Sequence, residues 1–350
     1  MTRTQALATT MNMVDDPVMQ DVTGQIAPKS RRIYEHGAAV FATWIIERGL
    51  TPIQLTKSDI IAYRVYLSEH YKETTASNML SVARRILEEQ VDRKQIESNP
   101  AAHVKGFKGL DETPHIALTG TEAQALLDAI DTRTLAGLRD YVLILFLLRT
   151  GIRRMEAAAL LLSDLHMEQG HHIATVRQGK GNKQHTVKVP VEVQREIDSY
   201  IKERKRTHEE DFQHQAAALE RKREQGLDEE TYQAKRKQLV ELHTMSEDDG
   251  LFVRVRRGDH PMRTAITDRA IADIVKQYAE KIDVDRLRPH GLRASFITLT
   301  LEAGATLHQV QHAVNHADPR TTLRYQKRKL NLDHNAVDTL HFMKRKQGSQ

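Results

Sequence analysis

The sequence predicts a mainly α-helical protein of two domains, with a small antiparallel β-sheet in the second domain. Three observations lead to this fold class. Apolar residues recur at helical spacing over most of the chain, residues 171–190 alternate instead, and a stretch rich in glycine and charge separates two helical regions. The chain has 350 residues, which is long enough to bury two separate cores.

The composition narrows the classes of function. The chain is 39% hydrophobic and 28% charged, as is usual for a soluble globular protein, and it has no cysteine, which excludes disulfides and thiolate chemistry. The longest apolar run, Tyr141 to Leu148, is too short to cross a bilayer, and the N-terminus lacks the apolar core of a secretory signal. We therefore expect a cytoplasmic protein. The net charge of +5 suits a nucleic-acid partner, but it would serve an acidic small substrate equally well.

The first domain is expected at residues 28–108. A flexible tail at residues 1–27 precedes it, because that stretch has no lasting periodicity. Apolar stripes predict three helices in the domain: one around Trp44, one that begins at a cap at Thr56 or Ser58, and one from about Thr75 to Val91. The stretch from about Lys105 to Pro114 contains two glycines, a proline and mixed charges, and a linker is expected at residues 109–118.

The second domain is expected at residues 119–343, and it opens with a capping box at Thr119 and Glu122. Residues 171–190 alternate on both sides of a Gly-Lys-Gly-Asn turn, which predicts a β-hairpin. A highly charged segment at about residues 207–248 has a sparse apolar stripe and a glycine near its middle. This pattern predicts an inserted antiparallel helical hairpin, solvated or in contact with another subunit.

Four short motifs of the second domain hold residue types that can act on a phosphodiester. In chain order they are Thr150-Gly151-Ile152-Arg153-Arg154-Met155-Glu156, Gly179-Lys180-Gly181-Asn182-Lys183, His290-Gly291-Leu292-Arg293, and Asn315-His316 followed after nine positions by Tyr325. Each motif alone is weak, since an H-x-x-R is expected roughly once by chance in such a chain. The order and spacing of all four are much harder to obtain by accident.

These residue types suit phosphodiester transfer without a metal. A tyrosine can attack phosphorus and keep the bond energy in a covalent phosphotyrosine. Two guanidiniums match the negative charge that spreads over the non-bridging oxygens in the transition state. Histidines can donate hydrogen bonds or move protons near neutral pH, and a lysine on a turn can protonate the departing 5′ oxygen.

Together the motifs resemble the tyrosine recombinase family, which includes phage integrases and the Xer-type resolvases. The family signature is T-G-x-R-x-x-E, then G-K-G-x-K on a hairpin, then H-x-x-R, then G-H with a tyrosine about nine residues later. The resemblance covers roughly residues 28–340. It implies a SAM-like helical core-binding domain at residues 28–108 and an integrase-type catalytic domain at residues 119–343, which carries the 207–248 insertion.

The resemblance also implies roles for single residues. Arg153 and Arg293 would clamp the scissile phosphate, His290 and His316 would complete its hydrogen bonding, Lys180 would be the general acid, and Tyr325 would form the 3′-phosphotyrosyl link. Glu156 would support the site by pairing with an arginine. The implied activity is site-specific recombination through a Holliday junction by a homotetramer on double-stranded DNA, with no cofactor or metal and with accessory proteins as further candidate partners.

The sequence leaves several features open. Asn315 departs from the family, which has glycine there, and Lys183 could replace Lys180 as the acid. His308, His312 and His316 share a helix face that could suggest zinc, although no other ligand type supports a metal. The candidate DNA contacts, which could equally face water, are Arg84, Arg85, Lys183, Arg254, Arg256 and Arg257.

Two other functions compete with recombination. A type IB-like topoisomerase or telomere resolvase would share the chemistry without two-site strand exchange, but the size and domain layout disfavour both. A catalytically silent DNA-binding regulator could use the same fold. The presence of all six predicted catalytic residues argues against it, because drift should have removed some of them.

Overall fold

The computed structural model describes residues 17–26, 28–107, 116–177 and 184–325. It divides the chain into two compact units, Met1–Asp111 and Glu112–Gln350, and each unit has its own hydrophobic core. Helices dominate both units, and two small antiparallel sheets lie in the second. The predicted fold class is confirmed.

The first unit consists of helices around one aromatic cluster. Its elements are α2 (Pro17–Gly24), α3 (Pro28–Glu47), the 3-10 turn η1 (Pro52–Gln54), α4 (Lys57–His70) and α5 (Glu73–Asp92). Thr56 is the cap of α4, and its hydroxyl accepts a hydrogen bond from the amide of Asp59. Phe41 and Trp44 of α3 pack against Tyr63 of α4, with ring centroids 4.9 and 5.2 Å apart.

The prediction of a flexible tail at residues 1–27 is wrong for its last part. Residues Pro17–Gly24 form helix α2, which buries Val18, Met19 and Val22. Arg93 at the end of α5 donates a hydrogen bond to the Pro17 carbonyl, which anchors α2 on the unit. The helix is too short for a periodic signal, and its apolar face is stabilised by packing on α5 rather than by helix propensity.

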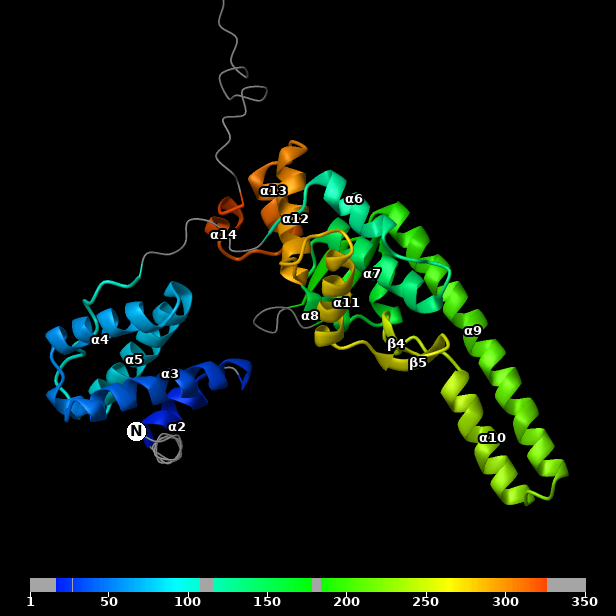
Figure 1. Cartoon of the computed structure of the whole chain (residues 1–350), viewed down its shortest axis with the longest axis horizontal. Coiled ribbons are helices and arrows are strands. Elements are labelled where there is room, and N and C mark those ends of the chain that lie inside the picture. Colours follow the sequence, from blue (N-terminus) through cyan, green and yellow to red (C-terminus); the bar gives the residue numbers. More distant parts are fainter. Residues whose placement is uncertain (1–16, 27, 108–115, 178–183, 326–350) are drawn as a thin grey trace, which may run out of the picture. The chain divides into compact units, whose positions relative to one another are not determined.

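The second unit is built around α7, a helix that is buried along nearly its whole length. The elements before the insertion are α6 (Gly120–Asp128), α7 (Leu135–Thr150), α8 (Arg154–Ala158), the 3-10 turn η2 (Leu162–Asp164), β1 (Leu165–Glu168), β2 (His171–Val176) and β3 (His185–Lys188). Those after it are β4 (Val253–Arg256), β5 (His260–Ala265), α11 (Asp268–Glu280), α12 (Pro289–Glu302), α13 (Leu307–Ala313) and α14 (Pro319–Leu323). Figure 1 shows α12 and α13 side by side beyond α7.

The sheets contain more strands than the sequence predicted. Strands β2 and β3 pair antiparallel, as expected for the hairpin at residues 171–190, and β1 adds a third strand at the other edge of β2. Strands β4 and β5 form a separate two-stranded sheet. Strand β1 was missed because three of its four residues are exposed and no apolar alternation marks it.

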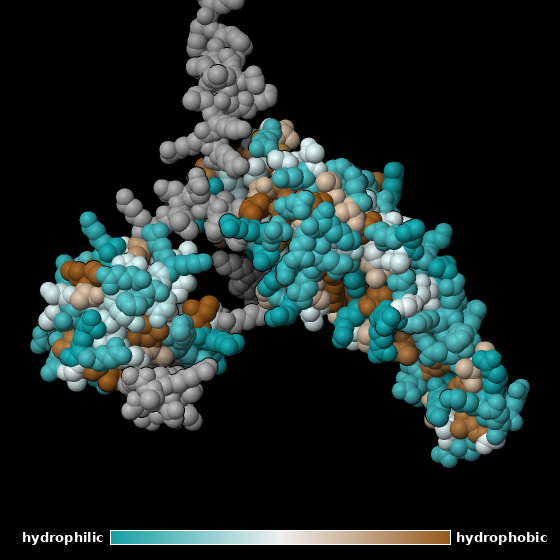
Figure 2. Space-filling view, viewed as in Figure 1, coloured by the Kyte–Doolittle hydropathy of each residue, from teal (hydrophilic) through white to brown (hydrophobic). Residues whose placement is uncertain are grey.

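The predicted helical hairpin is present, but its first arm is longer than expected. Helix α9 (Val191–Glu224) runs without a break from the domain into the arm, and α10 (Glu229–His243) returns beside it after a turn at Gly226, which has a φ of 102°. The pair extends away from the rest of the second unit, and its surface is largely hydrophilic (Figures 1 and 2). Arg204 anchors its base, because this fully buried side chain donates to the Gly250 carbonyl.

The end of the predicted linker belongs to the second unit. Leu118 is buried in the core of this unit, and its amide donates a hydrogen bond to Oγ of Ser295 at 2.7 Å. Residues 108–115 lie outside the described part of the chain. None of the helices in the described residues is both long and apolar enough to span a membrane.

Candidate active site

The candidate active site begins where helix α7 ends. Gly151 terminates α7 in the left-handed region with a φ of 62°, and a Cβ at this position would lie 2.4 Å from Cδ1 of Phe296 in α12. Glycine is therefore needed both for the backbone conformation and for the close approach of α12. The turn leaves Arg153 as the cap residue of α8.

Arg293 of α12 is held from two sides by main-chain carbonyls. Only 2% of its surface is exposed, its Nη1 donates to the oxygen of Gly151 at 2.6 Å, and its Nη2 donates to that of Val314 at 2.6 Å. Burial, and then the charge of Arg153, lower the pKa of Arg293 to about 10, while Glu156 and Tyr325 act in the opposite direction. The guanidinium therefore stays charged at neutral pH in a fixed orientation.

Arg153 is oriented by a buried carboxylate. Its Nη1 donates to Oε1 of Glu156 at 2.8 Å, and its amide donates to Oε2 at 3.0 Å. The predicted pairing of Glu156 with an arginine is thus confirmed. Nη2 of Arg153 also lies 3.4 Å from the carbonyl oxygen of Asn315, which connects α8 to the turn that carries His316.

The departure at Asn315 has a conformational explanation. Asn315 adopts a φ of 50°, in the left-handed region that glycine enters without strain and that asparagine tolerates better than most residues. The chain can therefore make the same kind of turn with asparagine. His316 follows this turn, is 9% exposed, and its Nδ1 lies 2.9 Å from Oγ1 of Thr322.

Tyr325 closes the cluster. Its side chain is 6% exposed, and its hydroxyl lies 3.3 Å from Nε2 of His290. Its ring is nearly parallel to the imidazole of His316, at an interplanar angle of 18° and a centroid distance of 6.5 Å. One connected group is thus formed by five residues that are far apart in sequence: Arg153, His290, Arg293, His316 and Tyr325. Their catalytic roles remain predictions.

Sequence reasoning gave no role to two residues beside this group. Thr322 lies between His316 and Tyr325 in the sequence, but nothing in the sequence showed that its hydroxyl meets His316. Nε2 of His185, in β3, lies 4.0 Å from Oε2 of Glu156. The available signal was its place two positions after Lys183, the last residue of the Gly-Lys-Gly-Asn-Lys motif. Lys180 and Lys183 lie outside the described residues.

The candidate DNA-contact arginines fall into two groups. Arg254, Arg256 and Arg257 are exposed on β4 and the turn that follows it. Within the described residues, their side chains form no hydrogen bond. Arg84, which was expected to face DNA or water, is half-buried and donates to the carbonyls of Ala101 and Val104. Arg85 is exposed and donates to the side chain of Gln25.

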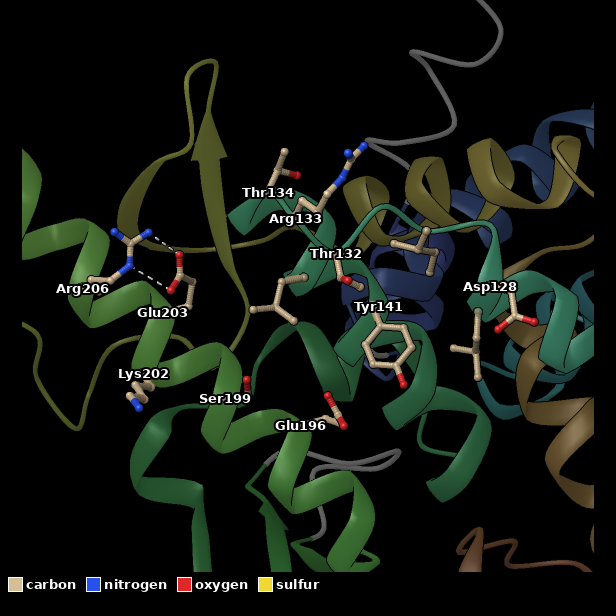
Figure 3. Close-up of a pocket in the computed structure, with 13 residues that line it drawn as sticks. Asp128, Thr132, Arg133, Thr134, Tyr141, Glu196, Ser199, Lys202, Glu203 and Arg206 are labelled. Atoms are coloured by element: carbon tan, nitrogen blue, oxygen red, sulfur yellow. Dashed lines mark hydrogen bonds and ion pairs between the residues drawn. The ribbon is translucent and has the colours of Figure 1, made fainter.

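A large hollow elsewhere on the second unit contains none of these residues. It has a volume of about 840 Å³ and lies between α9 and the α6–α7 region, and Figure 3 shows Glu196 of α9 close to Tyr141 of α7. Acidic and basic side chains both line it. In the described part of the chain, no group of three or more His, Asp or Glu side chains is arranged to hold a metal.

Comparisons with known proteins show which family the chain resembles. Residues 117–331 match the model of the phage integrase family. The tyrosine recombinase XerD of Halalkalibacterium halodurans is 28% identical over 274 residues, covering 77% of this chain and 77% of the relative. The tyrosine recombinase XerC of Myxococcus xanthus is 27% identical over 312 residues, covering 88% and 89%.

Two solved structures share the fold. One is the XerH site-specific recombinase bound to a palindromic difH substrate in a post-cleavage complex, with a TM-score of 0.63 at 17% identity over 92% of this chain and 85% of the other. The other is a lambda integrase tetramer bound to a Holliday junction, with a TM-score of 0.57 at 15% identity over 91% and 76%.

Proposed function

Since the chain belongs to the phage integrase family and is a tyrosine recombinase, we propose that it cuts and rejoins DNA at specific sites through a covalent link between Tyr325 and a 3′ phosphate. The observation that carries this proposal is the position of the Tyr325 hydroxyl, 3.3 Å from Nε2 of His290 and in the same cluster as two arginines. A phenol beside an imidazole can lose its proton as it attacks phosphorus.

The two arginines would stabilise the transition state. Arg293 is preorganised by its two carbonyl partners and Arg153 by Glu156, so neither has to reorient when charge develops on the phosphate. Nε of Arg293 is buried and has no hydrogen-bond acceptor among the described residues. Buried donors are almost always paired, so this nitrogen is suited to an additional acceptor such as a phosphate oxygen.

The other residues of the site would complete the cleavage of the phosphodiester. The Tyr325 oxygen forms a bond to phosphorus, the bond to the 5′ oxygen breaks, and Lys180 protonates the departing oxygen. His290 and His316 hydrogen-bond to the phosphate and assist proton transfer. The reverse attack by a 5′ hydroxyl from another strand releases Tyr325 and rejoins the DNA, so no energy source is needed.

The partner is double-stranded DNA, and the assembly is a homotetramer on two sites. Support comes from the neighbours, one bound to its difH substrate and one a tetramer on a Holliday junction. Arg254, Arg256 and Arg257 are proposed to contact the DNA backbone, since they are exposed and positively charged. Arg84 is left out, because its guanidinium already binds main-chain carbonyls.

The test uses nicked duplexes taken from the DNA that flanks the gene. A nick close to the cleavage site lets the short fragment beyond it diffuse away, which traps the covalent intermediate. The wild-type chain is expected to form an adduct that survives detergent and disappears with protease. Tyr325→Phe should bind the same DNA and form no adduct. Tyr141→Phe, which changes a tyrosine of the separate hollow, is the matched control and should keep adduct formation.

The outcomes separate the competing functions. Absence of an adduct over all flanking duplexes would favour a silent DNA-binding protein. An adduct that persists in Tyr325→Phe would assign the nucleophile elsewhere. A chain that forms adducts and relaxes supercoiled plasmids, but never exchanges strands between two duplexes, would favour a topoisomerase.

A further inference from the structure

Thr322 contacts both the imidazole of His316 and the main chain of Tyr325. Its hydroxyl oxygen is 2.9 Å from Nδ1 of His316, and its carbonyl oxygen accepts a hydrogen bond from the amide of Tyr325 at 3.0 Å. The side chain is fully buried, with no exposed surface. One residue therefore holds both the imidazole and the main chain of the proposed nucleophile.

The main chain of His316 is also fixed. Its amide donates to the carbonyl of Gln311 at 3.1 Å, and its carbonyl accepts from Nε2 of Gln311 at 3.0 Å. With both main-chain groups bound, the imidazole ring retains rotation about its side-chain bonds as its main freedom. The contact with Thr322 restricts that rotation.

The direction of the hydrogen bond follows from the burial of Thr322. A hydroxyl has one proton to donate, and buried donors are almost always paired. Across the described residues, Nδ1 of His316 is the one hydrogen-bond partner that the hydroxyl has. If Nδ1 carried the proton, the hydroxyl would accept that bond and its own proton would be buried without an acceptor. The hydroxyl therefore donates to Nδ1, and the neutral imidazole carries its proton on Nε2.

We propose that Thr322 is a positioning residue that keeps His316 in the tautomer with a proton on Nε2 and aligns it with the segment that carries Tyr325. In this tautomer Nε2 can donate to a non-bridging oxygen of the scissile phosphate, whereas the other tautomer would present a lone pair to a negative charge. The inference rests on the proposed function for its catalytic consequence, and on the structure alone for the tautomer.

The first test needs no substitution. Long-range proton–nitrogen NMR spectra of the full-length chain distinguish a protonated Nε2 from a protonated Nδ1, and His316→Gln assigns the signal. We expect the wild-type imidazole to carry its proton on Nε2 above the pH at which it becomes charged. A proton on Nδ1 in the wild-type chain would overturn the proposal.

The second test compares variants of Thr322. Thr322→Val keeps the shape and removes the hydroxyl, Thr322→Ser keeps the hydroxyl, and Thr321→Val changes a neighbouring threonine as the matched control. Thr322→Val should lose the preference for the Nε2 proton and slow adduct formation roughly 10- to 100-fold, with DNA binding unchanged. Thr322→Ser and Thr321→Val should stay close to wild type in both measurements.

The proposed function and the role of Thr322 can be contradicted by different results. A wild-type chain that forms no adduct contradicts the proposed function, while its NMR spectrum still decides the tautomer. A folded Thr322→Val variant that keeps the wild-type tautomer and cleavage rate rejects the role of Thr322 even if the chain is a recombinase.

Discussion

The carbonyl oxygen of Gly151 accepts a hydrogen bond from Nη1 of Arg293 at 2.6 Å, across 142 positions of sequence. The turn that ends α7 therefore does more than reverse the chain. It supplies an acceptor that fixes a buried guanidinium, while the Val314 carbonyl fixes it from the other side. The orientation of the predicted phosphate clamp is thus set by the main chain of two separate segments.

Replacement of Arg293 by lysine should keep the charge and lose this orientation. An ammonium cannot reach both carbonyls and also present a planar pair of donors to phosphate. We expect adduct formation to fall on the order of 100- to 1000-fold, as when one preorganised transition-state donor is removed. The measurement is the single-turnover cleavage rate beside DNA affinity. A lysine variant with near-wild-type cleavage would show that charge alone suffices.

Gly151→Ala should destabilise the second unit through two effects. The left-handed φ of 62° costs a residue with a Cβ about 1–2 kcal/mol, and the new Cβ would meet Phe296 at 2.4 Å, which adds about 1–3 kcal/mol of overpacking. Denaturant unfolding measures the loss. The control is the double variant Gly151→Ala with Phe296→Leu, in which the clash is relieved. Its loss of stability should be smaller than the sum of the losses in the two single variants. Strict additivity would mean that the ring does not resist the new methyl group.

The sequence predicts the membership of the site better than its geometry. The four motifs predict that Arg153, His290, Arg293, His316 and Tyr325 share one site, and the structure brings these five residues together. They do not show what orients each side chain, since the carbonyls that bind Arg293 come from segments folded together by tertiary packing. The contact between His316 and Thr322 also depends on tertiary packing, because the two residues are six positions apart and share no helix or strand.

The fold shows the same division. Periodic helices such as α3 and α5 follow from the sequence, because their apolar stripes extend over several turns. Helix α2 and strands β1, β4 and β5 do not, because segments of four to eight residues have too few positions for a period to emerge. Their structure depends on partners that the local sequence does not reveal.

Glu156→Gln should loosen Arg153. The carboxylate accepts two hydrogen bonds from Arg153 and is almost fully buried, whereas an amide offers one oxygen and one nitrogen to the same two donors. We expect the free energy of unfolding to fall by about 1–3 kcal/mol, because one half-buried donor of Arg153 loses its acceptor, and we expect slower adduct formation. Glu192→Gln, which breaks an exposed pair with Arg149, is the control and should lower the stability much less. Equal losses in the two variants would argue against a special role for the buried pair.

Acid should weaken the base of the α9–α10 hairpin through His208. Burial, and then the charges of Arg204 and His243, lower the pKa of His208 to about 4, from its ordinary value near 6.5. The unfolded chain thus binds a proton near pH 6.5 that the folded chain resists until about pH 4. Stability from the neutral imidazole is fully present above pH 6.5 and is lost as the pH falls from 6.5 toward 4.

His208→Gln should therefore flatten this part of the pH profile. Thermal unfolding followed by circular dichroism between pH 7.5 and 4.5 gives the stability of wild type and variant. The carboxylates that both proteins share contribute equally to the two curves, so their effect cancels in the difference. We expect the variant to lose less stability than wild type below pH 6.5. His214→Gln, at an exposed position of the same helix, is the control and should follow the wild-type curve. Parallel curves for wild type and His208→Gln would mean that His208 is not held neutral in the folded chain.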